Sequence, residues 1–415
     1  MSLELTQIEQ NMLAGEHGFA ARKSMEILVA LAKIYAADRM IPVSSVQVAG
    51  VSYDNLGDAG LEFIETMADG GGKARVLTTL NPAGIDIQDW QRLGVDEQFA
   101  KKQKQILTAF ARMNVITTCT CTPYLAGNLP HYGEHIAWAE SSAVCYANSV
   151  IGARTNREGG PSALASAITG VTPQYGLHLT HHRKPDLCVE VTDKPDHSSE
   201  QLATSWFGAL GKIIGQELER KAAKHIPLIR GLPGASLEEL KSFCASIATY
   251  GGVGLFHMEG ITPEADLFEH PPDILRIEAG AVDQMAEAMR QITSTEVDFI
   301  NLGCPHLSIK EIAYIAHRLE GHSVNREFWI TTARTTKQIS DMMGYTQIIE
   351  RSGVKFAADT CCIVAPIKGK YHTLATDSAK ACYYGYAKNA FDIYFNSLDD
   401  ILNLAIQDAN REQSA

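Results

Sequence analysis

Residues 117–160, TTCTCTPYLAGNLPHYGEHIAWAESSAVCYANSVIGARTNREGG, are the stretch on which the interpretation of this sequence depends. They hold three cysteines, three carboxylates, two histidines and two prolines in about a tenth of the chain. Neither an amphipathic helix nor an alternating strand requires such a mixture of side chains. We therefore expect the stretch to form part of a functional site that the flanking elements hold in place.

On both sides of this stretch, strand-like runs alternate with helix-like runs. The predicted strands are residues 43–48, 74–80, 115–118, 187–191, 226–230, 299–302, 328–331 and 355–358. The predicted helices are a short one opened by the capping box Thr6-x-x-Glu9, then residues 18–37, 56–68, 99–113, 133–146, 162–168, 206–223, 237–249, 281–293, 309–319, 336–344, 378–390 and 398–408. This alternation predicts an α/β protein with parallel or mixed sheets flanked by helices. We expect residues 1–415 to form one catalytic region of several lobes, with a candidate hinge at residues 193–200.

Composition narrows the class of protein. The net charge is −12 and no run of Lys or Arg stands out, which argues against a nucleic-acid partner. The N-terminal sequence MSLELTQIEQNML lacks the basic and apolar regions of a signal peptide, and no apolar run reaches the roughly 18 residues of a membrane span. We therefore expect a cytoplasmic protein without a membrane partner, whose nine cysteines are reduced.

Three cysteines share a position relative to the predicted strands. Cys121, Cys304 and Cys361 each come just after a strand, beside Thr, Gly or Pro. In open α/β sheets, ligands bind in the crevice beyond the carboxyl ends of the strands. Three thiolates delivered there could hold an iron–sulfur cluster and leave one coordination position for substrate or solvent. An open iron can act as a Lewis acid on a substrate hydroxyl.

Other interpretations of these residues remain open at this point. A single cysteine at a strand end is more often a small buried apolar residue than a ligand. Cys119, two residues before Cys121, also permits a zinc site, although no second pair with zinc-finger spacing accompanies it. The cysteines within apolar or helical runs are expected in the core: Cys145, Cys188, Cys244 and Cys382. We expect the following histidines in loops or in the core: His131, His135, His181, His182, His306 and His372.

Two short segments after strands would reach the same crevice as the cysteines. Gly50, Val51 and Ser52 follow one predicted strand, and Asn81 and Pro82 follow the next. Glycine allows a ligand to approach the backbone, and exposed N–H groups suit an anionic oxygen. The alternative is that both segments are ordinary turns between a strand and a helix.

Charged residues near predicted helices are further candidates. Glu140, followed by Ser141, could act as a base, an acid or an orienting group for a substrate hydroxyl, or could lie on a solvated helix face. Lys380 lies near a predicted helix N-terminus, where a positive charge opposes the helix dipole. Its position weakly favours an anionic ligand.

Several long motifs, in order and spacing, resemble the aconitase X family. They cover essentially the whole chain and are GVSYDNLGDAGLEF (50–63), residues 119–160 of the opening stretch, NLGCPHLSIKE (301–311), DTCCIVAP (359–366) and DSAKACYYG (377–385). The resemblance implies an aconitase-like hydro-lyase with a large catalytic part and a small swivelling part. It also implies an iron–sulfur cluster, expected to be of the [4Fe-4S] type.

The resemblance assigns roles residue by residue. It implies that Cys121, Cys304 and Cys361 bind the cluster, although Cys362 and Cys119 are adjacent alternatives. It implies that Glu140 and Ser141 take part in catalysis, and that the substrate contacts are Gly50, Val51, Ser52, Asn81, Pro82, Glu140, Ser141 and Lys380.

The family contains two kinds of protein that act on small anionic hydroxy acids. Some bacterial members are fused single chains that dehydrate cis-3-hydroxy-L-proline. Others, mainly archaeal, are heterodimers that dehydrate (R)-mevalonate 5-phosphate to trans-anhydromevalonate 5-phosphate on a route to isoprenoids. The sequence ends at Ala415, without room for a fused small domain, and its motifs are more similar to the heterodimeric kind.

The resemblance therefore implies a large subunit whose small partner supplies a catalytic serine. Cis-3-hydroxy-L-proline dehydratase is the alternative activity. Two further candidates are a non-catalytic iron–sulfur scaffold subunit and an isomerase that rehydrates its product.

Overall fold

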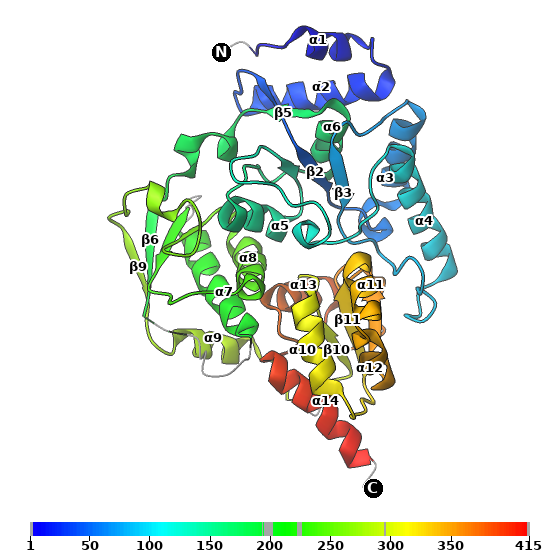
Figure 1. The fold of residues 1–415 in the computed structure, drawn as a ribbon, viewed down its shortest axis with the longest axis vertical. Coiled ribbons are helices and arrows are strands. Elements are labelled where there is room, and N and C mark those ends of the chain that lie inside the picture. The colour runs from blue at the N-terminus through cyan, green and yellow to red at the C-terminus, as the bar shows by residue number, and fades with distance from the viewer. Residues whose placement is uncertain (1–2, 193, 195–201, 222–225, 294–295, 413–415) are drawn as a thin grey trace.

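The computed structural model describes residues 3–412 apart from 193, 195–201, 222–225 and 294–295. Three parallel sheets and one antiparallel pair of strands are covered by helices, as Figure 1 shows. The α/β architecture expected from the alternating pattern is thereby confirmed. The candidate hinge at residues 193–200 lies outside the described residues, except for Lys194.

The N-terminal part is built around a three-stranded parallel sheet of order β3-β2-β4. An antiparallel pair, β1 with β5, lies beside it. Its strands are β1 (Met40–Pro42), β2 (Ser45–Val48), β3 (Leu77–Leu80), β4 (Ala137–Trp138) and β5 (Val171–Pro173). Its helices are α1 (Gln7–Ala14), α2 (Phe19–Ile34), α3 (Tyr53–Asp69), α4 (Glu97–Arg112), α5 (Ser141–Tyr146) and α6 (Gly160–Thr169).

The middle part contains a four-stranded parallel sheet of order β8-β7-β6-β9. Its strands are β6 (Leu187–Val191), β7 (Pro227–Arg230), β8 (His257–Met258) and β9 (Ile274–Ile277). Its helices are α7 (Thr204–Arg220), α8 (Leu237–Gly251) and α9 (Ala281–Met289). Helix α5 of the N-terminal part packs on α8, so the two parts share a hydrophobic core.

The C-terminal part contains a five-stranded parallel sheet of order β12-β11-β10-β13-β14. Its strands are β10 (Phe299–Leu302), β11 (Glu327–Thr332), β12 (Lys355–Ala358), β13 (Thr373–Thr376) and β14 (Asp392–Phe395). Its helices are α10 (Ile309–Leu319), α11 (Arg334–Met342), α12 (Tyr345–Arg351), α13 (Ala379–Asn389) and α14 (Leu398–Glu412).

Local signals in the sequence explain where several helices begin. Thr6 with Glu9, Ser236 with Glu239 and Ser308 with Glu311 form capping boxes at α1, α8 and α10. Each box satisfies two backbone N–H groups that would otherwise lack a partner. The central strands are largely buried, and in β10 all four residues are buried. Such double burial is typical of parallel sheets covered by helices.

Two predicted elements differ from the structure. Residues 115–118 do not form a strand; Ile116 makes only an isolated bridge to Thr79. Residues 133–146 are not one helix, because Ala137 and Trp138 pair with β2 and the helix begins only at Ser141. Strands β13 and β14, which the sequence pattern did not indicate, complete the C-terminal sheet.

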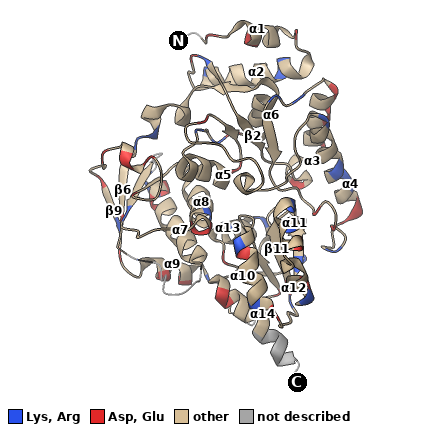
Figure 2. Cartoon of the chain, in the orientation of Figure 1, with Lys and Arg blue, Asp and Glu red and all other residues tan. Residues whose placement is uncertain are grey.

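The exterior carries both signs of charge. In the view of Figure 2, basic and acidic residues are interspersed over the helices that surround the sheets. Within the described residues, no helix combines the length and apolar character needed to cross a bilayer.

Candidate active site

The three predicted cluster ligands lie in loops that leave the N-terminal and C-terminal sheets. Cys304 and Cys361 follow β10 and β12, and Cys121 follows the bridge at Ile116. Their exposed fractions are 8% for Cys121, 9% for Cys304 and 7% for Cys361, whereas the adjacent Cys119 and Cys362 are both 0% exposed. The three predicted ligands therefore keep slight access to solvent, whereas the two adjacent cysteines have none.

His306 connects the three cysteine-bearing loops. Its backbone N–H donates to Cys121 Sγ at 3.2 Å. Its ring contacts Thr120 Oγ1 through Nδ1 at 3.0 Å and the Thr360 carbonyl through Nε2 at 2.9 Å. Because a carbonyl can only accept, Nε2 carries the proton and Nδ1 accepts from Thr120. Burial lowers the pKa of His306 to about 4, so the ring is neutral and holds this tautomer at physiological pH.

The three thiols lie within electrostatic reach of one another. Burial raises the pKa of Cys121, and Glu140 and Cys361 raise it further, while Lys380 opposes them. Burial likewise raises the pKa of Cys304 to about 12, with Cys361 adding to the effect and Lys380 and a hydrogen bond to Ser378 opposing it. Thiols of this kind become thiolates only with a positive partner such as a metal.

Cys361 has its own hydrogen-bond donors. Burial raises its pKa, and the backbone N–H groups of Ile363 and Val364 are the main opposing influence. Each of the three predicted ligands thus has a hydrogen-bond donor at its sulfur, either a backbone N–H group or a hydroxyl.

Glu140 and Lys380 form a buried ion pair beside these thiols. The residues come from α5 and α13, 240 positions apart, and Lys380 Nζ lies 2.5 Å from Glu140 Oε1. The other carboxylate oxygen caps α5, because it accepts from Ala143 N at 2.7 Å and from Ser142 Oγ at 2.5 Å. Ser141, the first residue of α5, lies with its hydroxyl 3.4 Å from Glu140 Oε1. The predicted catalytic pair and the predicted lysine are therefore brought together.

The ion pair sets the charge of both partners. Burial by itself would raise the pKa of Glu140, but the Lys380 ammonium and the hydrogen bonds outweigh burial and lower it. Burial would lower the pKa of Lys380, but Glu140, Cys304 and Cys121 outweigh burial and raise it. Glu140 is therefore an anion and Lys380 a cation at neutral pH.

The two predicted substrate segments are held together by Gln103 of α4. Its Oε1 accepts from Tyr53 N at 2.8 Å and Gly84 N at 3.0 Å, and its Nε2 donates to the Val51 carbonyl at 3.0 Å. Ser52, which precedes α3, donates through its hydroxyl to the Val364 carbonyl at 3.1 Å. The segment 50–52 thus lies against both the segment 81–84 and the loop that follows Cys361.

Buried acceptors at this junction lack partners in the chain. Asn81 Oδ1 and Thr360 Oγ1 are both buried without a hydrogen-bond partner among the described residues. Such atoms call for an explanation, and a water or a bound group beside them is one. Among the described residues, no three His, Cys, Asp or Glu side chains converge closely enough to hold a single metal ion. A cluster contains several irons, so its ligands need not converge on one point.

Gly303, directly before Cys304, must be a glycine. Its φ is +112°, and a Cβ there would lie 2.2 Å from the Thr331 carbonyl oxygen. The close approach lets Thr331 Oγ1 donate to the Gly303 carbonyl at 2.7 Å. Strand β11 therefore fixes the backbone that carries Cys304.

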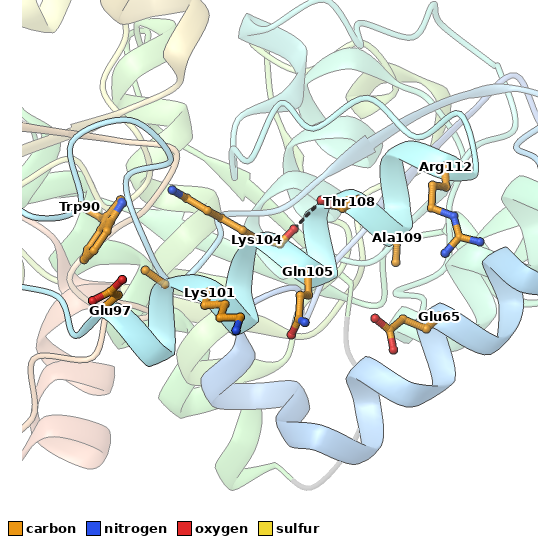
Figure 3. A pocket seen from close by; sticks show the side chains of 10 residues that line it. Glu65, Trp90, Glu97, Lys101, Lys104, Gln105, Thr108, Ala109 and Arg112 are labelled. Atoms are coloured by element: carbon orange, nitrogen blue, oxygen red, sulfur yellow. Dashed lines mark hydrogen bonds between the residues drawn. The ribbon is translucent and has the colours of Figure 1, made fainter.

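The cavity beside Cys304 is much smaller than the hollow on α4. A space of about 10 Å³, room for about one water molecule, lies beside Cys304 and is bordered by Lys241, Glu311 and Asp377. A hollow of about 410 Å³ lies instead on the outer face of α4, where Trp90 is at one end and Glu65 of α3 at the other (Figure 3). No predicted site residue lines the hollow on α4.

The sequence analysis missed His306 and Gln103. His306 was expected in a loop or the core. The only feature of the sequence that could have marked it as a site residue is its place two residues after Cys304. Gln103 lies inside a helix with no local pattern to mark it. Both act through contacts between distant parts of the chain, which sequence spacing does not reveal.

Comparison with known proteins agrees with the predicted family. Models of the aconitase X first, second and third domains match residues 2–181, 185–290 and 297–407. The chain is 44% identical to the phosphomevalonate dehydratase large subunit of Methanocaldococcus jannaschii, over 96% of this chain and 99% of that relative. It is 34% identical to the cis-3-hydroxy-L-proline dehydratase of Hypocrea jecorina, over 96% of this chain but only 68% of that relative.

A solved structure agrees with the fold. The crystal structure of Thermococcus kodakaraensis aconitase X in its holo-form superimposes with a TM-score of 0.88 at 41% sequence identity, covering 97% of this chain and 100% of that one. The three matched domains correspond to the three parallel sheets. This chain belongs to the aconitase X family.

Proposed function

We propose that the chain is the large subunit of a hydro-lyase that dehydrates (R)-mevalonate 5-phosphate to trans-anhydromevalonate 5-phosphate. The observation that carries the proposal is its 44% identity to phosphomevalonate dehydratase large subunits of two methanogens, over nearly the full length of both chains. The hydroxyproline dehydratases are less similar, at 31% and 34% identity, and extend well beyond the matched region.

We infer that Cys121, Cys304 and Cys361 would hold an iron–sulfur cluster, which we expect to be of the [4Fe-4S] type. Their slight exposure supports this assignment over Cys119 and Cys362, which are 0% exposed, and each of the three sulfurs also has a hydrogen-bond donor. Hydrogen bonds to cluster sulfurs are among the features that tune such centres. When bound, a cluster with three protein ligands supplies a Lewis acid for the leaving hydroxyl.

The chain's own residues supply the charge for an anionic substrate. The Lys380 ammonium has three N–H donors, and one is used by Glu140. The others can bind a carboxylate or phosphate oxygen. The segment Gly50, Val51 and Ser52, just before α3, adds backbone N–H groups of the kind that bind anions.

Glu140 is better suited to orient than to accept a proton. Its lowered pKa makes it a weak base, and both its oxygens already accept hydrogen bonds. We therefore propose that Glu140 fixes Lys380 and Ser141 for the substrate. The proton next to the substrate carboxylate would then be removed by a residue from elsewhere, which we assign to a serine of a small partner subunit.

The experiment is anaerobic co-expression of this chain with a small-subunit partner, followed by assays on (R)-mevalonate 5-phosphate and cis-3-hydroxy-L-proline. We expect the pair to dehydrate the first compound, and the chain alone to be inactive. Turnover of cis-3-hydroxy-L-proline instead would identify the alternative activity. A pair that binds iron but turns over neither compound would point to a scaffold role. In deuterated water, an isomeric hydroxy acid with deuterium on carbon would reveal an isomerase.

A further inference from the structure

A partly buried arginine bridges two buried carboxylates, one in the proposed substrate loop and one in the loop of Cys361. Arg334, the first residue of α11, donates from Nη2 to Asp86 Oδ1 and to Asp359 Oδ2, both at 2.5 Å. Its Nε donates to Asp359 Oδ2 at 3.0 Å. The Asp86 side chain is 0% exposed, that of Asp359 is 1% and that of Arg334 is 16%. One guanidinium thus pairs with two carboxylates that have almost no access to water.

Each carboxylate also holds backbone of the other loop. Asp86, which follows Asn81 and Pro82 in the chain, accepts from Ala358 N at 2.9 Å, at the end of β12. Asp359 accepts from Ile87 N through its side chain at 3.4 Å and from Ala83 N through its carbonyl at 2.8 Å. The segment 81–87 and the segment 358–361 are therefore joined in both directions.

Two local features at this bridge are unusual: one is a backbone angle and the other is the position of a charge. Asp359 has a φ of +65°, a left-handed conformation that few residues other than glycine adopt. Arg334 occupies the first turn of a helix, where a positive charge is unfavourable because of the helix dipole. Both features are accounted for by the bridge, which places the guanidinium between the two carboxylates. Asp359 is also only two residues before Cys361.

We propose that Arg334 is a positioning residue that fixes the loop of Cys361 relative to the substrate loop at Asn81 and Pro82. The role rests on the proposed function, because it assigns Cys361 to the cluster and Asn81 to the substrate. Arg334 itself touches neither. Its planar fork reaches both carboxylates at once, which a lysine ammonium does not reproduce.

The test compares Arg334→Lys and Arg334→Gln with Lys355→Met. Lys355 is a matched control because it pairs with Glu327 at 2.7 Å across the same two strands, β12 and β11, but at their amino ends. The first measurement is amide hydrogen exchange of the full chain in the peptide that contains Ala83 and Ile87. The second is the electron paramagnetic resonance spectrum of the reduced cluster. The third is kcat and KM of the complex with the small subunit.

We expect exchange at Ala83 and Ile87 to be at least tenfold faster in Arg334→Lys, with an altered cluster spectrum and kcat/KM lowered tenfold or more. Lys355→Met should stay within twofold of the parent in all three. Exchange and spectra in Arg334→Lys that match Lys355→Met would overturn the proposal. If Arg334→Gln does not fold, Arg334→Lys and the isosteric Asp86→Asn carry the test.

The exchange measurement needs neither substrate nor partner. A parent complex that fails to dehydrate mevalonate 5-phosphate would therefore refute the proposed function alone. Unchanged exchange in the Arg334 variants would refute the positioning role alone.

Discussion

The backbone N–H of His306 donates to Cys121 Sγ at 3.2 Å, although the two residues are 185 positions apart. The ring of the same histidine contacts Thr120 and the Thr360 carbonyl. One buried side chain thereby ties together the loops that carry Cys121, Cys304 and Cys361. The relative placement of the three thiols thus depends on a residue that is not itself a proposed ligand.

Replacing His306 with alanine should lower cluster occupancy without removing a ligand. The change leaves the Thr360 carbonyl without its buried partner, which costs about 1–3 kcal/mol. We expect iron per chain to fall to half or less and the unfolding midpoint in urea to decrease. His317→Ala, at an exposed position on α10, is the control and should leave both values unchanged. Full iron content in the His306 variant would show that the loops do not need this link.

The cysteine assignments predict a clear division among five single substitutions. Alanine at Cys121, Cys304 or Cys361 should abolish visible cluster absorbance and lower activity at least about 100-fold, because each removes a proposed thiolate ligand. Alanine at Cys119 or Cys362, both 0% exposed, should leave the cluster in place. Iron analysis of anaerobically purified proteins checks this. Cluster loss in the Cys362 variant with retention in the Cys361 variant would reverse the assignment at that pair.

Local sequence pattern was enough to mark several candidate site residues. It could not mark residues whose contacts arise only when distant parts of the chain come together. Cys304 and Cys361 follow real strands, as their Thr and Gly neighbours and apolar runs indicated. Strand β13 escaped notice because it has only four residues, Thr373–Thr376, with neither a long apolar run nor an alternation of apolar and polar residues. Lys380 does lie in the first turn of α13, as the sequence predicted, but its partner Glu140 is 240 residues away. Contacts between residues so far apart in the sequence depend on how whole sheets pack together. No local sequence pattern predicts that packing.

The same limit explains the error at residues 133–146. Ala137 and Trp138 form a strand only because β2 is present to pair with them. Glu140 then lies at the N-cap of α5 instead of on a helix face, and this position gives it the Ala143 N–H and the Lys380 ammonium as partners. The sequence marked Glu140 as a candidate, but only the fold shows which groups it contacts.

Breaking the Glu140–Lys380 pair should be more harmful than removing both charges. Lys380→Met leaves the buried Glu140 carboxylate uncompensated, and removing one partner of a buried pair typically costs about 3–5 kcal/mol. We expect the double variant Lys380→Met/Glu140→Gln to recover much of that loss in urea unfolding. Both proteins should still lose activity by about 100-fold or more, because the cation proposed to bind the anionic substrate is gone in each. Additive losses of stability in the double variant would mean that the two side chains do not interact.

A pair of histidines far from the cysteines predicts how stability depends on pH. His135 and His178 lie with their Nδ1 atoms 3.0 Å apart, so one donates to the other only while at least one ring is neutral. Burial is the main cause that lowers the pKa of His178 to about 3, with His135, Arg183 and Arg154 contributing to the same shift. Burial lowers the pKa of His135 as well, and Arg154 and Arg183 add to that effect. The folded protein therefore resists protonation at this pair.

The direction in which stability changes with pH follows from the protonation of His178 in the unfolded and folded states. In the unfolded chain His178 takes up a proton as pH falls through about 6.5, whereas the folded protein does so only near pH 3. The stabilising contribution is thus complete above about pH 6.5 and is lost progressively below it. For His178 alone, the free energy of unfolding should fall by about 2 kcal/mol between pH 7 and pH 5. In urea titrations across that range, His178→Gln should flatten the slope, and the exposed control His322→Gln should not. A parent protein equally stable at pH 7 and pH 5 would show that these rings are already solvated in the folded state.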